Sequence, residues 1–171
     1  DIEIEISLAP TEATAQRAEW RERVATAASL RPLFHPVSIA IVGASRDPQS
    51  IGYRLLDAVR TYQFRGQVYP VNPHASSIGG MPAYPSLRAV PGPVDLAVIA
   101  VPNDIVPKVV EECALKGVRA LVVISSGFAE VGEEGRRKQD RLLDAVRQHG
   151  MRLVGPNCFG ILNTDPAVHL N

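Results

Sequence analysis

Cysteine is scarce in this chain, and neither of its two thiols is placed as a metal ligand or as part of a disulfide framework. Cys113 and Cys158 form no CxxC pair and stand in no cluster with histidine. The sequence therefore predicts neither a zinc site nor a fold stapled by disulfides. We interpret both residues as buried free thiols in a protein of the reducing cytoplasm.

A net charge and a long apolar run are missing as well. The 18 Lys and Arg residues balance the 18 Asp and Glu residues, and a neutral chain offers no general surface for nucleic acid. No apolar segment approaches the roughly 18 residues of a membrane helix, and no signal peptide is visible, so we expect no membrane partner. The chain opens at Asp1 without a methionine, and we expect it to be part of a longer protein.

Two zones are present along the chain, and we place the domain boundary between residues 1–33 and 34–171. In the first zone, residues 2–8 alternate polar and apolar side chains, which predicts a half-buried strand. Pro10 ends that strand. An alanine-rich helix is then expected from Thr11 to about Ser29, with Thr11 or Thr14 as its N-cap. Its apolar stripe is thin, which is typical of a connector.

The second zone has a regular rhythm of strands and helices. Its strands are apolar on both faces, and helices separate them, which indicates a parallel sheet covered on both sides. We predict an α/β fold, a doubly wound and mostly parallel Rossmann-like sheet with helices on both faces. A long loop or short helical turn replaces one helix at 72–93. The predicted strands are 38–42, 67–71, 95–101, 120–124 and 151–154, and the predicted helices are 52–62, 104–116 and 133–149.

The usual nucleotide fingerprints fail in this zone. When the G-x-G-x-x-G pattern is counted from Gly43, its second and third glycine positions hold Ser45 and Pro48. The dinucleotide fingerprint is therefore absent. An NAD site usually places an acid after the second strand, where this chain has Asn72-Pro73. No GxxxxGK[ST] occurs, which excludes a P-loop. These departures count against a nicotinamide-dependent oxidoreductase, which we keep as an alternative.

A catalytic pair is hard to assemble from the sequence. Of the four histidines only His74 falls at the end of a strand. Asp104 and Glu130 are expected near the same edge, but helix capping or solvation explains them equally well. We find no nucleophile next to a base. The sequence therefore predicts no catalytic residue and no metal site on this chain.

Small, turn-forming residues follow every predicted strand. In an open parallel sheet, ligands bind outside the carboxyl ends of the strands, and a glycine after the first strand lets the backbone approach a phosphate at the next helix. Turns alone also need such residues, but five strand ends of this kind favour a binding site. The segments are Gly43-Ala44-Ser45, Asn72-Pro73-His74, Pro102-Asn103-Asp104, Ser125-Ser126-Gly127 and Gly155-Pro156-Asn157.

These segments carry a resemblance to a known family. From about Leu30 to Leu162 the chain resembles the coenzyme-A-binding domain of NDP-forming acyl-CoA synthetases, which are relatives of the succinyl-CoA synthetase alpha subunit. The match rests on the order and position of several motifs rather than on any one of them. The motifs are the run from Leu33 to Arg46, Ser50-Ile51-Gly52, Val71-Asn72-Pro73, Ala100-Val101-Pro102, Ser125-Ser126-Gly127-Phe128 and the run from Gly155 to Gly160.

The resemblance implies coenzyme A or an acyl-CoA as the ligand and a role for each motif. The turn from Gly43 to Gly52 would hold the pyrophosphate, and Arg46 is its nearest cation. Some relatives carry a basic residue after the second strand, which the stretch 74–77 lacks. From the residues themselves, Val71, Val101 and Ile105 offer an apolar wall for adenine. The full set of implied contacts is Gly43, Ala44, Ser45, Arg46, Ile51, Gly52, Asn72, Pro73, Val101, Pro102, Ser125, Ser126, Gly127 and Asn157.

The resemblance also implies partners elsewhere in the parent chain. In the family a flavodoxin-like domain carries a phosphorylated histidine, and an ATP-grasp domain binds nucleotide. The family also occurs fused to GNAT-type protein acetyltransferases, and residues 2–33 resemble the tail of such a preceding domain. We therefore expect a coenzyme A or acyl-CoA binding domain that is not catalytic on its own. A regulatory Rossmann domain with a vestigial pocket is the remaining alternative.

Overall fold

The computed structural model of this chain describes residues 11–170, so the strand expected at 2–8 lies outside the described residues. The chain divides into two compact units, residues 1–30 and 31–171. The helix α1 (Glu12–Phe34) contributes to both units. Thr11 caps it, because its hydroxyl accepts a hydrogen bond from the Thr14 N–H at 3.3 Å. Among residues 11–170, no helix is both long and apolar enough to cross a membrane.

The helix α1 is longer than the sequence predicts. It continues past Ser29 to Phe34 and takes Pro32 into its last turn. The added turn contains the buried Leu33. We attribute the extension to packing of that side chain, which outweighs the loss of the N–H that Pro32 cannot donate.

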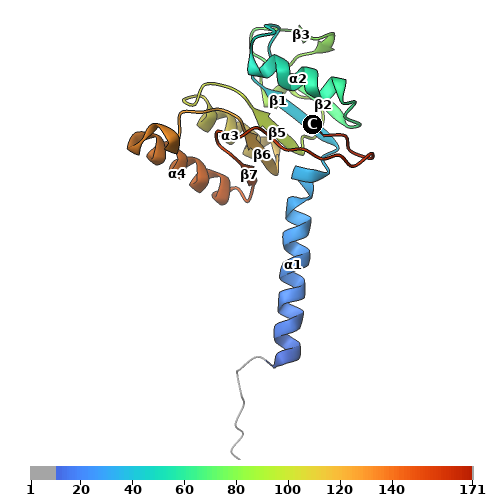
Figure 1. Cartoon of the computed structure of the whole chain (residues 1–171), viewed down its shortest axis with the longest axis vertical. Helices are drawn as coiled ribbons and strands as arrows, with labels where there is room; N and C mark the ends of the chain where they lie inside the picture. Colours follow the sequence, from blue (N-terminus) through green and yellow to red (C-terminus); the bar gives the residue numbers. More distant parts are fainter. Residues whose placement is uncertain (1–10, 171) are drawn as a thin grey trace, which may run out of the picture. The chain divides into compact units, whose positions relative to one another are not determined.

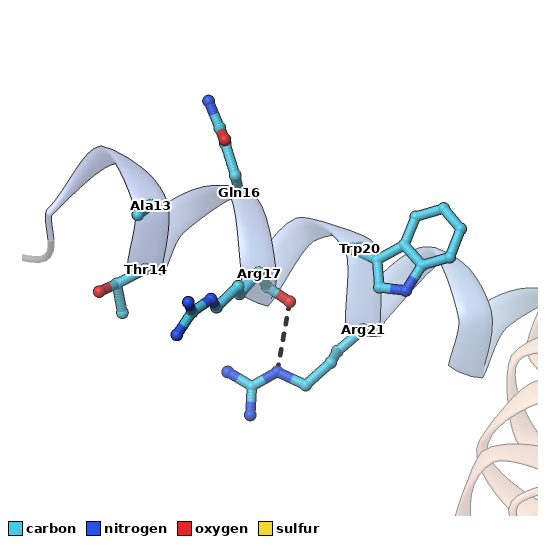
Figure 2. Close-up of a pocket in the computed structure, with 6 residues that line it drawn as sticks. All are labelled: Ala13, Thr14, Gln16, Arg17, Trp20 and Arg21. Atoms are coloured by element: carbon cyan, nitrogen blue, oxygen red, sulfur yellow. Dashed lines mark hydrogen bonds between the residues drawn. The ribbon is translucent and has the colours of Figure 1, made fainter.

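A single stretch of α1 carries an exposed aromatic ring beside arginines. Figure 2 shows Trp20, Arg17 and Arg21 on this stretch, where the Arg21 Nε donates to the Arg17 carbonyl oxygen at 3.3 Å. Trp20 is 68% exposed. All residues that line this hollow belong to α1. A hollow bounded by one helix has no second wall, so it is not the candidate site.

Five parallel strands form the sheet of the second unit, in the order β2-β1-β5-β6-β7. Their registers are continuous, since Val42 pairs with both Val71 and Ile99. β1, β5 and β6 are buried along their whole length, as their unbroken apolar runs predict. The bounds are β1 Ser38–Val42, β2 Gln67–Val71, β5 Leu96–Ile99, β6 Ala120–Val123 and β7 Arg152–Val154.

Helices cover both faces of this sheet, as the prediction of a doubly wound fold requires (Figure 1). On one face α3 (Val106–Lys116) and α4 (Glu133–Gln148) pack on alternate residues of β1, β5 and β6. On the other face α2 (Ile51–Thr61) places Leu56 and Val59 against Ile41. A 3-10 turn, η2 (Ala129–Val131), leads into α4.

The segment 72–93 contains more structure than the loop or helical turn predicted there. It holds a two-stranded hairpin, β3 (Ser77–Ile78) with β4 (Met81–Pro82), and the 3-10 turn η1 (Leu87–Ala89). Gly79 and Gly80 join the two strands with φ of 57° and 80°, which suits a two-residue hairpin turn. The Gly-Gly pair was the available signal, but strands of two residues are too short to show a pattern.

Candidate functional site

The switch in strand order lies between β1 and β5, and the turns that follow these strands touch. From β1 the chain crosses to β2 on one side, whereas β5 leads to β6 on the other. The Ala100 N–H donates to the Val42 carbonyl oxygen at 2.9 Å. Gly43 has φ of 92°, and a Cβ there would collide with the Ala100 carbonyl oxygen and lie 3.0 Å from Val101 Cγ1. Only glycine fits this turn, for both its conformation and its contacts.

The loop from Ser45 to Ser50 is held by its own side chains. The Asp47 N–H donates to the Ser45 hydroxyl oxygen at 3.0 Å, and the Gln49 N–H donates to Asp47 Oδ1 at 2.9 Å. Ser50 is the N-cap of α2, since its hydroxyl accepts from the Tyr53 N–H at 3.1 Å and donates to the Asp47 carbonyl oxygen at 2.7 Å. The loop is therefore held by hydrogen bonds from its own side chains.

The first turn of α2 rests directly on the turn after β1. A Cβ on Gly52 would collide with the Gly43 carbonyl oxygen and lie 3.1 Å from Ala44 Cα. The backbone N–H groups of Ile51 and Gly52 have no hydrogen-bond acceptor within residues 11–170. Such free N–H groups and the positive end of the helix dipole attract an anion. Arg46, in the loop that precedes α2, is exposed and makes no ion pair within the described residues.

The side-chain amide of Asn72, which follows β2, is hydrogen-bonded to the protein backbone through both of its polar atoms. Its Nδ2 donates to the Ala44 carbonyl oxygen at 2.7 Å, and its Oδ1 accepts from the His74 N–H at 2.7 Å. Asn72 therefore ties the end of β2 to the turn after β1. An aspartate could not donate the bond to Ala44, which is a structural reason for an amide at this position.

The turn after β6 is joined to both neighbouring strand ends. The buried Ser125 donates its hydroxyl to the Val101 carbonyl oxygen at 2.6 Å. The Asn157 N–H, after β7, donates to the Ser125 carbonyl oxygen at 3.0 Å. Ser126 is exposed, whereas Gly127 is half-buried against the Asn103 amide.

A series of direct contacts thus crosses all five strand ends. It runs from Asn72 to Ala44, through Gly43 to Val101, and on to Ser125 and Asn157. Around this series Arg46, Ile51, Pro73 and Pro102 are exposed. Within the described residues, no group of three His, Cys, Asp or Glu side chains could hold a metal ion.

The chain matches one family model over residues 37–164, that of the CoA binding domain. The chain belongs to this family. Every residue predicted to contact the ligand lies inside the matched range, and the match begins one residue before β1.

Curated relatives support the same assignment. The CoA-binding domain is 46% identical over 131 residues to the ADP-forming acetate–CoA ligase II subunit alpha of Pyrococcus furiosus, covering 77% of this chain and 28% of that protein. It is 45% identical over 140 residues to an ADP-forming acetate–CoA ligase II of Archaeoglobus fulgidus, covering 82% of this chain and 21% of that protein. The chain therefore spans less than a third of the length of these relatives.

A solved structure agrees with the fold. It is the dinucleotide forming acetyl-coenzyme A synthetase 1 of Candidatus Korarchaeum cryptofilum, in complex with phosphate and ADP. The TM-score is 0.74 at 46% identity, over 77% of this chain and 28% of that chain. The predicted Rossmann-like α/β fold and coenzyme A as the ligand are thereby confirmed, and the nicotinamide alternative is disfavoured.

Some residues at this site were not singled out by sequence reasoning. Asp47 shapes the loop before α2, and Asn103 packs on Gly127. Glu130, which the sequence places only near the edge, accepts hydrogen bonds from the Gly127 and Phe128 N–H groups. Its position three residues after Gly127 was the available signal, since a carboxylate at that spacing can reach back to a turn.

Proposed function

We propose that the CoA-binding domain holds coenzyme A or an acyl-CoA along the carboxyl ends of its five strands. The observation that carries this proposal is the series of contacts from Asn72 to Asn157. Through these contacts, residues that follow all five strands lie next to one another at one edge of the sheet. Ligands of open parallel sheets bind at this edge. The free N–H groups of Ile51 and Gly52 supply an anion site at one end of it.

The parts of the coenzyme follow from the chemistry of this edge. The phosphates lie over the turn from Gly43 to Gly52, where Arg46 supplies a positive charge. The adenine packs near Val101 and Ile105, and Ile105 is 46% exposed although it is apolar. Ser126 and Gly127 face the neutral pantetheine arm. In this arrangement Asn72 positions the Gly43 turn and makes no direct contact through its amide.

We further propose that the parent protein is an ADP-forming acyl-CoA synthetase of the cytoplasm. The names of the relatives and the small share of their length that this chain spans support this proposal, and both cysteines are free. In such a protein a flavodoxin-like domain and an ATP-grasp domain would perform the transfer. A fusion with a GNAT-type protein acetyltransferase is the second candidate, which rests on resemblance alone.

Isothermal titration of the chain with coenzyme A, acetyl-CoA and NAD tests the proposed function. We expect heat with both coenzyme A species and none with NAD. Absence of heat with both coenzyme A species would overturn the proposal, whether or not NAD binds. Exchange of Arg46 for alanine is expected to weaken coenzyme A binding, while exchange of Arg147, on the last turn of α4, is expected to leave it unchanged.

A further inference from the structure

The turn after β6 binds a carboxylate from its own loop. The Gly127 N–H donates to Glu130 Oε1 at 2.5 Å, and the Phe128 N–H donates to Glu130 Oε2 at 3.2 Å. Gly127 has φ of 97°, a conformation that lets the two successive N–H groups converge. Concave turns of this kind are anion sites. Glu130 therefore occupies a place where an external anion, such as a phosphate, could otherwise bind.

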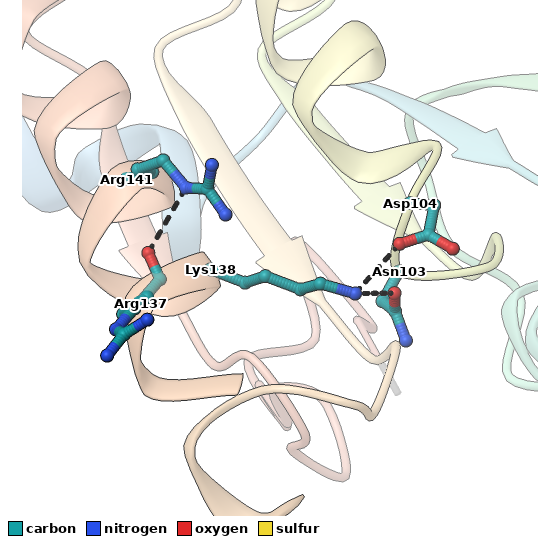
Figure 3. Close-up of polar contacts among 5 residues, drawn as sticks. All are labelled: Asn103, Asp104, Arg137, Lys138 and Arg141. Atoms are coloured by element: carbon teal, nitrogen blue, oxygen red, sulfur yellow. Dashed lines mark hydrogen bonds and ion pairs between the residues drawn. The ribbon is translucent and has the colours of Figure 1, made fainter. Parts of the chain in front are cut away.

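The rest of this loop is anchored independently of Glu130. Asn103 packs on Gly127, and its Oδ1 accepts from Lys138 Nζ at 3.3 Å. Figure 3 shows Lys138 reaching from α4 to Asn103 and Asp104. Gln139 Oε1 accepts from the Ala129 N–H at 3.4 Å. These α4 contacts would remain after loss of the Glu130 side chain, so its removal should free two N–H groups without releasing the whole loop.

The charge of Glu130 is maintained near neutral pH. The hydrogen bond from the Gly127 N–H, followed by further backbone hydrogen bonds, holds the pKa of Glu130 below its ordinary value. A carboxylate therefore stands at the β6 end of the proposed coenzyme site, whereas free N–H groups and Arg46 stand at the α2 end. Phosphates are repelled from the first end and attracted to the second.

We propose that Glu130 is a positioning and specificity-determining residue of the coenzyme A site, because its carboxylate acts as a built-in anion in the turn after β6. It fixes the shape of Ser125-Ser126-Gly127 for the neutral arm of the coenzyme. It also excludes the phosphates from this turn, so that the coenzyme binds in one direction only. This role rests on the proposed function and adds a residue that does not itself contact the ligand.

Chemical rescue separates this role from a general effect on folding. In Glu130→Ala we expect coenzyme A to bind about tenfold more weakly, because the turn after β6 is no longer held in the shape that receives the neutral arm. Sodium formate should restore most of the affinity, because formate can refill the two N–H groups, whereas sodium chloride at equal ionic strength should not. Glu134→Ala is the matched control: it removes another exposed carboxylate at the start of α4 and should bind as the wild type does.

Glu130→Gln gives a second, independent variant. Its side chain fills the same space but presents an NH2 group to one of the two N–H donors, so binding should weaken and formate should not restore it. If circular dichroism shows that Glu130→Ala does not fold, the affinity of Glu130→Gln for coenzyme A tests the proposal by itself. Wild-type affinity in Glu130→Gln would then overturn the proposal, as would weakened binding by a folded Glu130→Ala chain that formate fails to restore.

Amide NMR tests the exclusion of phosphate. On titration with inorganic phosphate, the Gly127 and Phe128 resonances should shift in Glu130→Ala and stay in place in the wild type. If phosphate shifted these two resonances equally in both proteins, or in neither, the idea that Glu130 excludes phosphate from the turn would be overturned. A wild-type chain that binds no coenzyme A overturns the proposed function itself, whereas unchanged coenzyme A binding by Glu130→Ala overturns only the role of Glu130.

Discussion

Gly52 shows how closely the backbone must approach at the candidate site. Alanine normally stabilises a helix relative to glycine by about 1 kcal/mol. Here the added methyl group would meet the backbone of Gly43 and Ala44, which cannot move as a flexible side chain can. We expect Gly52→Ala to lower the free energy of unfolding by about 1–3 kcal/mol, measured by urea denaturation.

The matched control for this substitution is Asp57→Ala, an exposed position on the same helix. It should change the free energy of unfolding by no more than about 0.5 kcal/mol. If Gly52→Ala were as stable as the wild type, the first turn of α2 would not be packed against the turn after β1 as described.

Asn72 distinguishes the two ligand classes at a single residue. In Asn72→Asp a carboxylate oxygen would face the Ala44 carbonyl oxygen, so the hydrogen bond is lost and replaced by repulsion. We expect the free energy of unfolding at pH 7 to fall by about 1–3 kcal/mol. The substitution also introduces the acid that an NAD site usually has at this position, yet we expect no NADH binding by fluorescence titration.

Asn72→Ala serves as the comparison, because it removes the donor without adding a charge. It should be less destabilised than Asn72→Asp. Tight NADH binding by Asn72→Asp would show that the acid was the only element missing for a nicotinamide site, and would contradict the structural role of the amide.

At the scale of elements, an ion pair joins α4 to the turn between β5 and α3. Lys138 Nζ lies 2.9 Å from Asp104 Oδ1, with the Lys138 side chain 29% exposed and that of Asp104 77% exposed (Figure 3). A double-mutant cycle with Lys138→Gln and Asp104→Asn should give a coupling energy of about 0.2–1 kcal/mol that falls in high salt. Glu133 and Arg137, an exposed pair on α4 itself, are the control for a pair within one helix. A salt-independent coupling between Lys138 and Asp104 would mean that the contact is not chiefly ionic.

Sequence reasoning predicted β1, β2 and α2 most closely. The bounds of β1 and β2 were predicted in full, and α2 was displaced by one residue. A short β-branched run that ends at a glycine, as in β1, leaves few alternatives, and the apolar residues of α2 recur at helical spacing. The hairpin of β3 and β4 was missed because two-residue strands carry no periodicity. The end of α1 was misplaced because tertiary packing of Leu33 overrides the local effect of Pro32.

The position of the strand-end residues at one edge was predictable from the sequence, but their hydrogen bonds were not. Parallel strands bring their carboxyl ends to one edge, so Gly43, Val101 and Ser125 could be grouped from the sequence. That the amide of Asn72 faces Ala44, or that Glu130 closes the turn at Gly127, depends on side-chain directions. Sequence spacing alone does not determine those directions.

At the scale of the whole molecule, Cys113 reports on global unfolding. It is fully buried in the core between α3 and the sheet, and burial, with a smaller effect of Glu112, raises the pKa of its thiol to about 12. Only the thiolate reacts readily. In Cys158→Ser we therefore expect no labelling by a thiol reagent at pH 8 in the native state, and one thiol labelled in urea.

The urea dependence of this labelling should follow the unfolding curve measured by circular dichroism. Fast labelling without denaturant would mean that the core opens locally around α3. The matched variant Cys113→Ser, which keeps the half-buried Cys158, shows how the other thiol behaves.

The loop from Ser45 to Ser50 has a consequence for the speed of binding. Its shape is set by the hydroxyls of Ser45 and Ser50 and by Asp47 rather than by the coenzyme. A loop whose shape is held by its own hydrogen bonds needs no slow rearrangement after encounter. In stopped-flow mixing, the observed rate should rise linearly with coenzyme A concentration in a single phase. Loss of the Asp47 side chain should introduce a plateau, because the loop would then have to find its shape before the phosphates can be held.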